Sequence, residues 1–130
     1  MYRAVTRKVE VKVTPRFVQE RSSPANGYFF WAYTIDITNH GLETVQLKTR
    51  HWRITDALGR LQEVKGPGVV GEEPVLKPGE SFEYTSGVPL PTPSGFMVGS
   101  YGLVTGNGEH FDIEIPAFSL DSSFAERTLN

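Results

Sequence analysis

Hydrophobic and polar residues alternate along most of the chain, in segments separated by clusters of Gly, Pro and Asn. Because neighbouring side chains of a strand point to opposite faces, alternation with a period of two predicts strands that are buried on one face. The clearest alternation runs from residue 28 to residue 38, and its apolar face consists of Phe29, Trp31, Tyr33, Ile35 and Ile37. Helical periodicity is almost absent. The pattern therefore predicts an all-β protein with these five side chains in its core.

The same alternation predicts further strands. The first has an apolar side formed by Val5, Val9, Val11 and Val13. Pro15 follows and marks an edge or a bulge, because proline has no amide hydrogen to donate. Later strands are expected at residues 45–55, 60–65, 81–86, 97–105 and 109–115, and the inward face of the last consists of Phe111, Ile113 and Ile115. Short strands between turn residues are typical of an antiparallel β-sandwich.

The length of 130 residues suits one domain with a core of its own and is too short for two. We assign residues 1–120 to a single sandwich domain and residues 121–130 to a polar tail, in which Asp121 either caps one helical turn or lies in a frayed end. Two Gly/Pro-rich connections, residues 66–74 and 89–95, are expected to lack regular structure. Long loops in compact domains often carry function, so both are candidate recognition surfaces.

Charge and cysteine content narrow the classes of partner. Thirteen Lys and Arg residues against fifteen Asp and Glu give a net charge of −2, without the basic excess of dedicated nucleic-acid or anionic-membrane binders. No apolar stretch approaches the roughly 18 residues of a membrane span, and no Cys is present for a disulfide or a thiolate site. We expect a cytoplasmic protein without a cofactor that binds neither nucleic acid nor membrane; its oligomeric state is left open.

Distinctive short motifs are spread over residues 5–120 and include HWRITD at 51–56, GPGVVGE at 66–72, LKPGE at 76–80, YTSG at 84–87, TPSG at 92–95 and GSY at 99–101. Together these motifs resemble those of the bacterial ApaG family. The resemblance implies an immunoglobulin-like or fibronectin type III-like antiparallel β-sandwich of about seven or eight strands. It also implies a link to cobalt tolerance and magnesium efflux, and related domains that serve as protein-interaction modules. It transfers no catalytic residue.

Gly66, Gly68 and Gly71 have the G-x-G-x-x-G spacing of pyrophosphate-binding loops. That motif functions where it follows a strand and opens a helix whose free amides meet the phosphates. Here Glu72 and Glu73 follow directly, so two carboxylates would repel the ligand. We interpret the glycines as structural, needed where the backbone takes a positive φ. Pyrophosphate binding and protein binding by this loop are the alternatives.

Three residues of metal-ligating type alternate near the end of the predicted domain. His110, Asp112 and Glu114 should project from the outer face of one strand, and carboxylates suit magnesium while imidazole suits cobalt. Such side chains start about 7 Å apart, so a shared ion would need them to lean together. We interpret them as a solvated strand face, with weak magnesium or cobalt binding as the alternative. His40 is interpreted as a turn residue, and His51 as a packing or hydrogen-bonding residue.

Lys48, Arg50 and Trp52 share one face of the predicted strand at 45–55, with Arg53 beside them. This basic and aromatic patch could stack on a base or meet an acidic partner. The alternative is ordinary surface charge, which contributes only tenths of a kcal/mol. Trp31 is expected to be buried between the sheets, whereas Trp52, among cationic side chains, is expected to be partly exposed.

The sequence contains no G-x-S-x-G, S-x-x-K or H-E-x-x-H motif, and Ser86 and Ser94 have no assignable base. We therefore expect a non-enzymatic binding module that docks another protein, with the cation phenotype relayed through that partner. The alternative is a sensor that binds a divalent metal or a nucleotide directly, through the outer face at 110–114 or through the glycine loop.

Overall fold

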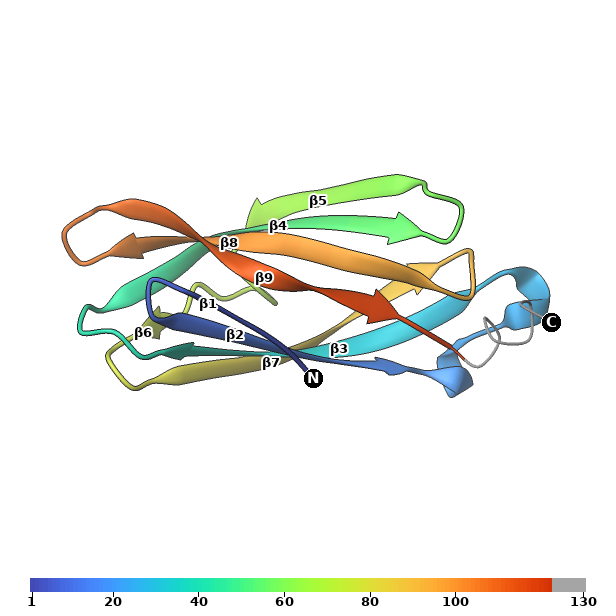
Figure 1. Cartoon of the computed structure of the whole chain (residues 1–130), viewed down its shortest axis with the longest axis horizontal. Helices are drawn as coiled ribbons and strands as arrows, with labels where there is room; N and C mark the ends of the chain where they lie inside the picture. The colour runs from blue at the N-terminus through green and yellow to red at the C-terminus, as the bar shows by residue number, and fades with distance from the viewer. Residues whose placement is uncertain (123–130) are drawn as a thin grey trace.

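The computed structural model describes residues 1–122, so the tail predicted for 121–130 lies outside the described residues apart from its first two positions. Two antiparallel sheets pack face to face (Figure 1). The first has the order β1-β2-β3-β7, formed by Tyr2–Thr6, Val9–Phe17, Phe29–Asn39 and Ser81–Leu90. The second has the order β5-β4-β8-β9, formed by Leu61–Pro67, Val45–Asp56, Gly95–Thr105 and His110–Leu120. The short strand β6 (Val75–Leu76) pairs with β4.

The predicted all-β antiparallel sandwich is confirmed, with nine strands in the described residues instead of seven or eight. Two short 3-10 helices, η1 (Gln19–Arg21) and η2 (Pro24–Asn26), connect β2 to β3. Within residues 1–122, no helix is long and apolar enough to cross a membrane.

β3 lies inside the first sheet and provides the part of the core that the sequence predicted best. Its five apolar side chains from Phe29 to Ile37 are all buried, and its register against β2 places Ile35 opposite Val13. In β9, Ile113 and Ile115 are buried and Phe111 is partly buried. The predicted inward faces of these two strands are therefore confirmed.

The first predicted strand is instead a hairpin of β1 and β2. A two-residue turn joins them, in which Arg7 and Lys8 have φ values of 48° and 65°, as tight hairpins require. Across this turn the inward face changes from even positions in β1 to odd positions in β2, but Val5, an apolar residue at an odd position, hides the change in the sequence. Because paired residues point to the same face, Val5 lies opposite Glu10 on the outer face and is 47% exposed. The prediction that Val5 shares the face of the three buried valines is wrong.

Two strands run further into proline-containing sequence than predicted. β7 continues through Pro89, and β5 continues through Gly66 to Pro67. Both are edge strands of their sheets, where a residue without an amide hydrogen is tolerated. The irregular connections are correspondingly shorter than expected. Pro15 lies where β2 extends beyond its pairing with β1, which confirms its predicted edge position.

The two sides of the sandwich differ in how they are closed. On one side β1 lies against β9, where the Glu114 amide donates to Thr6 Oγ1 (3.1 Å) and the Arg7 guanidinium pairs with Glu109 (3.0 Å). On the other side the edge strands are β7 and β5, and no hydrogen bond between described residues joins them. The sandwich therefore opens between β5 and β7.

Candidate functional site

The open side of the sandwich leads into a cleft of about 360 Å³ between the two sheets. β3 and β7 contribute one wall, β4 and β5 contribute the other, and the loop after β5 adds Val69 and Val70. The polar side chains in its lining include Arg50, Gln62 and Ser86, and most of the remaining surface is aromatic or aliphatic. A preformed apolar hollow with a few polar groups is the usual form of a binding site. We refer to this feature as the β5/β7 cleft.

The loop at residues 68–74 folds back to the mouth of the β5/β7 cleft. The Gly68 amide donates to the Lys48 carbonyl of β4 (2.9 Å), and Val69 and Glu72 exchange backbone hydrogen bonds of 2.8 and 2.9 Å around a two-residue turn. The Val69 side chain is buried in the core, whereas Val70 is 55% exposed beside the cleft. Val70 has a φ of 44°, which β-branched residues rarely adopt. Backbone strain of this kind concentrates at functional sites.

The three glycines of the G-x-G-x-x-G spacing each have a structural reason in this loop. A Cβ on Gly68 would lie 2.3 Å from the Glu72 carbonyl oxygen, and a Cβ on Gly66 would lie 3.1 Å from the Arg50 guanidinium. Gly71 has a φ of 81° within the two-residue turn, which favours glycine. The short strand β6 follows the loop, where a pyrophosphate-binding loop would be followed by a helix.

Arg50 places a positive charge at the β5/β7 cleft. Its Nη1 donates to the Pro67 carbonyl (2.8 Å) and to the Gly68 carbonyl (3.0 Å), so the loop fixes the guanidinium. The N–H groups on Nε and Nη2 have no acceptor among the described residues, and no described carboxylate forms an ion pair with Arg50. Lys48, in contrast, pairs with Glu73 at 2.6 Å. The Arg50 guanidinium is therefore fixed in position, and no described carboxylate balances its positive charge.

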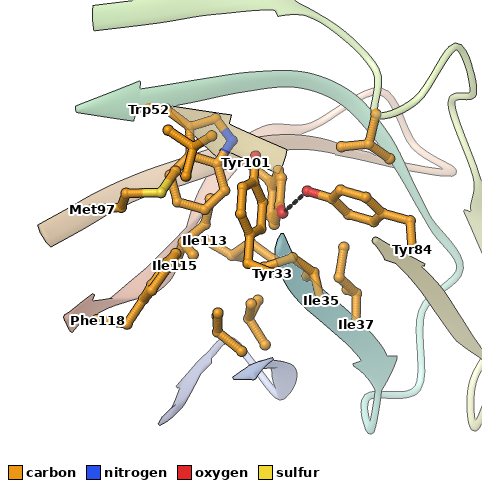
Figure 2. Close-up of a cluster of buried hydrophobic side chains, with 14 of the residues drawn as sticks. Tyr33, Ile35, Ile37, Trp52, Tyr84, Met97, Tyr101, Ile113, Ile115 and Phe118 are labelled. Atoms are coloured by element: carbon orange, nitrogen blue, oxygen red, sulfur yellow. Dashed lines mark hydrogen bonds between the residues drawn. The ribbon is translucent and has the colours of Figure 1, made fainter. Parts of the chain in front are cut away.

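Tyr33 and Tyr84 line the inner part of the cleft, and the fully buried Tyr101 contacts Tyr84. The Tyr84 and Tyr101 hydroxyls share a buried hydrogen bond, which Figure 2 shows beside Tyr33. Burial raises the pKa of Tyr33, Tyr84 and Tyr101, while the positive charge of Arg50 acts in the opposite direction on each. The field of the guanidinium thus reaches these hydroxyls. All three stay neutral near pH 7 and can donate or accept hydrogen bonds.

The basic and aromatic patch predicted on β4 is divided between two faces. A β-bulge between Leu47 and Thr49 shifts the alternation of the strand by one residue. As a result Arg50 lines the β5/β7 cleft on the inward side, whereas Arg53 is exposed on the outer face. Lys48 lies at the bulge itself. These side chains do not form the single surface that the sequence suggested.

Trp52 is a core residue and is only 3% exposed. Its ring makes edge-on contacts with Tyr33 (5.4 Å between centroids), Phe118 (5.9 Å) and Tyr101 (6.5 Å), as Figure 2 shows. The prediction of a partly exposed Trp52 is wrong, because the bulge turns Trp52 and Arg50 together to the inward side, where aromatic rings cover the indole, and only Arg53 points to the outer face. Trp31 is fully buried, as predicted.

The metal candidates lie on the outer face of β9, and all three are exposed: His110, Asp112 and Glu114. Within residues 1–122, no group of three or more His, Cys, Asp or Glu side chains is placed to hold a metal ion. His51 Nε2 lies 2.7 Å from Glu63 Oε2, and this hydrogen bond lowers the pKa of the carboxyl. The interpretation of His51 as a hydrogen-bonding residue is confirmed.

Sequence reasoning did not bring Tyr84, Ser86 and Val70 together with Arg50. Tyr84 and Ser86 come from β7, which lies in the other sheet from β4, and no local pattern indicates which strands border an open edge. No sequence signal indicated the positive φ of Val70 either, since β-branched residues rarely adopt it. The β5/β7 cleft is a product of the tertiary fold.

Comparison with known proteins agrees with this architecture. The family model of the ApaG domain (DUF525) matches residues 19–105. Relatives named Protein ApaG include one from Rhodospirillum centenum, 66% identical over 122 residues and 94% of each chain, and one from Rhodopseudomonas palustris, 65% identical over 130 residues and all of both chains. A crystal structure from Bordetella pertussis, named as an ApaA protein, has a TM-score of 0.86 at 51% identity and covers 88% of this chain and 94% of its own. The chain belongs to the ApaG family.

Proposed function

We propose that this chain is a non-enzymatic binding module that docks a protein partner at the β5/β7 cleft, with the loop at 68–74 as the rim. The observation that carries the proposal is Val70, a β-branched residue with positive φ that is exposed at the mouth of a preformed cleft. A left-handed conformation costs an L residue roughly 1–2 kcal/mol. Because Val70 is more than half exposed, packing within the free protein offsets little of that cost. Contact with a partner would use the side chain that the fold leaves in solvent.

The chemistry of the cleft lining also supports binding. Its functional groups are one guanidinium, one carboxamide, hydroxyls and aromatic faces, all of which recognise ligands by hydrogen bonds or packing. General acid-base catalysis works best with a group whose pKa lies near the working pH. Burial moves the pKa of Tyr33 and of Tyr84 upward, away from neutrality. On this proposal, the effects on cobalt tolerance and magnesium efflux that the family resemblance implies are relayed through the partner.

Affinity capture from a cell lysate with two matched variants tests the docking proposal. Val70→Asn removes the apolar rim side chain, and Asn tolerates the left-handed backbone. We expect the relief of strain to offset the lost packing, so that stability changes by no more than about 0.5 kcal/mol. Val5→Asn is the control, because Val5 is similarly exposed but lies on β1 in the opposite edge of the fold.

The wild-type protein and Val5→Asn should retain the same partner, and Val70→Asn should lose it. If folded Val70→Asn captures as much of that partner as the wild type does, the cleft is not the docking surface.

The alternative function, a direct metal or nucleotide sensor, has a separate test. NMR titrations with Mg²⁺, Co²⁺ and a dinucleoside polyphosphate should give no saturable shifts if the protein acts only through a partner. Saturable shifts on the outer face at 110–114, or at the glycine loop, would replace the docking proposal by direct sensing.

A further inference from the structure

The β5/β7 cleft is one-sided in charge. Among the residues that line it, Arg50 alone is charged at neutral pH. Its guanidinium is oriented through Nη1 by the carbonyls of Pro67, the last residue of β5, and Gly68, and it has N–H donors on Nε and Nη2 that no described residue accepts. A planar guanidinium with two adjacent donors matches the two oxygens of a carboxylate. The charge of the site therefore fits a single monoanionic group.

Polyphosphates fit this site poorly. A polyphosphate carries several negative charges, and the cleft offers one cation. Lys48, a second cation of β4 near the loop, already pairs with Glu73 at 2.6 Å. Glu72 lies in the turn that also holds Val70, so a second carboxylate stands beside the mouth. A ligand with one negative charge avoids most of this repulsion.

The surroundings of Arg50 require that the anion carry apolar groups. Val70 is exposed at the mouth, Val64 of β5 is partly buried beside it, and both line the cleft. The mouth also lies between the edge strands β5 and β7. Edge strands present unpaired backbone groups to which an extended peptide can bond. An extended peptide combines all of these features in one ligand.

We propose, as a refinement that rests on the docking function above, that the β5/β7 cleft binds an extended acidic segment of the partner protein. An Asp or Glu carboxylate of this segment accepts hydrogen bonds from the Arg50 guanidinium. The apolar side chain next to it packs against Val64 and Val70. The carboxylate provides specificity, because a neutral amide in its place would leave the cation uncompensated.

NMR titration of the full 130-residue chain with two capped tripeptides tests this assignment. The probes are acetyl-Leu-Glu-Leu-amide and acetyl-Leu-Gln-Leu-amide, which differ only in the charge of the central side chain. We expect saturable shifts of the Arg50 Nε–H and Trp52 indole N–H signals with the Glu peptide. The Gln peptide should bind at least about tenfold more weakly, a difference of about 1.4 kcal/mol.

Two variants locate the effect. Arg50→Gln should make the two peptides bind equally, and Arg53→Gln, which removes an exposed cation from the outer face of the same strand, should preserve the preference for Glu. If Arg50→Gln disturbs the loop, the comparison of the two peptides on the wild type still decides the question.

Several results would overturn the assignment. Equal binding of the two peptides, or the absence of saturation up to about 10 mM, where dissociation constants above 1 mM are still detected, would exclude an acidic segment. Tighter Arg50-dependent binding of 3-phenylpropionate would assign the site to a small organic acid, and tighter binding of inorganic pyrophosphate would assign it to a phosphate ligand. If the peptides fail while partner capture still depends on Val70, the docking function stands and only the acidic segment is wrong. If capture is independent of Val70, the docking function itself fails.

Discussion

Replacing Trp52 by Ala should destabilise the fold as severely as replacing Trp31. Both indoles are almost completely buried, at 3% and 0% exposure. Trp52 contacts aromatic rings from β3, β8 and β9, and the Trp31 indole donates to the Asp121 carbonyl (2.8 Å). Truncation of a buried Trp to Ala costs about 3–5 kcal/mol. That is a large part of the 5–15 kcal/mol by which a typical domain is stable.

Urea unfolding followed by circular dichroism measures this effect. With a slope of about 2 kcal/mol/M, a loss of about 4 kcal/mol lowers the midpoint by about 2 M. Arg53→Ala is the matched control, since Arg53 is next to Trp52 in β4 but exposed, and it should cost no more than about 0.5 kcal/mol. If Trp52→Ala loses less than about 1 kcal/mol, the packing argument for this core is refuted.

Three further predictions follow from the contacts of other residues. Tyr84→Phe leaves the buried Tyr101 hydroxyl without its partner and should lower the unfolding free energy by about 1–3 kcal/mol. Replacing both Tyr84 and Tyr101 by Phe should cost less than the sum of the two single replacements, and additive losses in a double-mutant cycle of denaturation measurements would contradict this. Hydrogen bonds from His40 and Arg3 lower the pKa of Glu10 from 4.5 to about 2, so the contribution of Glu10 to folding stability is complete above pH 4.5 and is lost as the pH falls towards 2. Glu10→Gln should flatten the dependence of unfolding free energy on pH in that window, and an unchanged dependence would disprove the role of these hydrogen bonds. Gly68→Ala should destabilise the fold more than Gly71→Ala, because only a Cβ at position 68 would clash with the backbone, 2.3 Å from the Glu72 carbonyl oxygen. Equal melting temperatures of the two variants would show that the loop adjusts freely.

The fold was predictable where alternation and burial coincide. β3 has uninterrupted alternation, so its core face is evident from the sequence. The β1–β2 hairpin was not predictable in this way, because Val5 continues the odd-numbered apolar positions although the inward residues of β1 are the even-numbered ones. Its turn residues Arg7 and Lys8 are also not the Gly or Asn that signal positive φ. An exposed apolar residue can therefore hide the change of inward face that a two-residue turn causes.

The site was less predictable, and β4 shows why. Val45 and Leu47 are buried at odd positions, whereas Trp52 and Ile54 are buried at even positions. This change of parity is a signal of the bulge, and it would have placed Trp52 in the core. No comparable signal indicates that β5 and β7 face each other across an open edge, since this depends on the packing of the two complete sheets.

Site-specific photo-cross-linking in living cells tests the docking surface most directly. A benzoylphenylalanine placed at Val70 lies at the mouth of the β5/β7 cleft, and the same residue placed at Val5 lies on the opposite edge strand. The docking proposal predicts one cross-linked product of defined mass from position 70 and none from position 5, and the acidic-segment assignment predicts loss of the product when Arg50→Gln is added. No product from position 70, or an equal yield of the same product from position 5, would contradict the docking proposal.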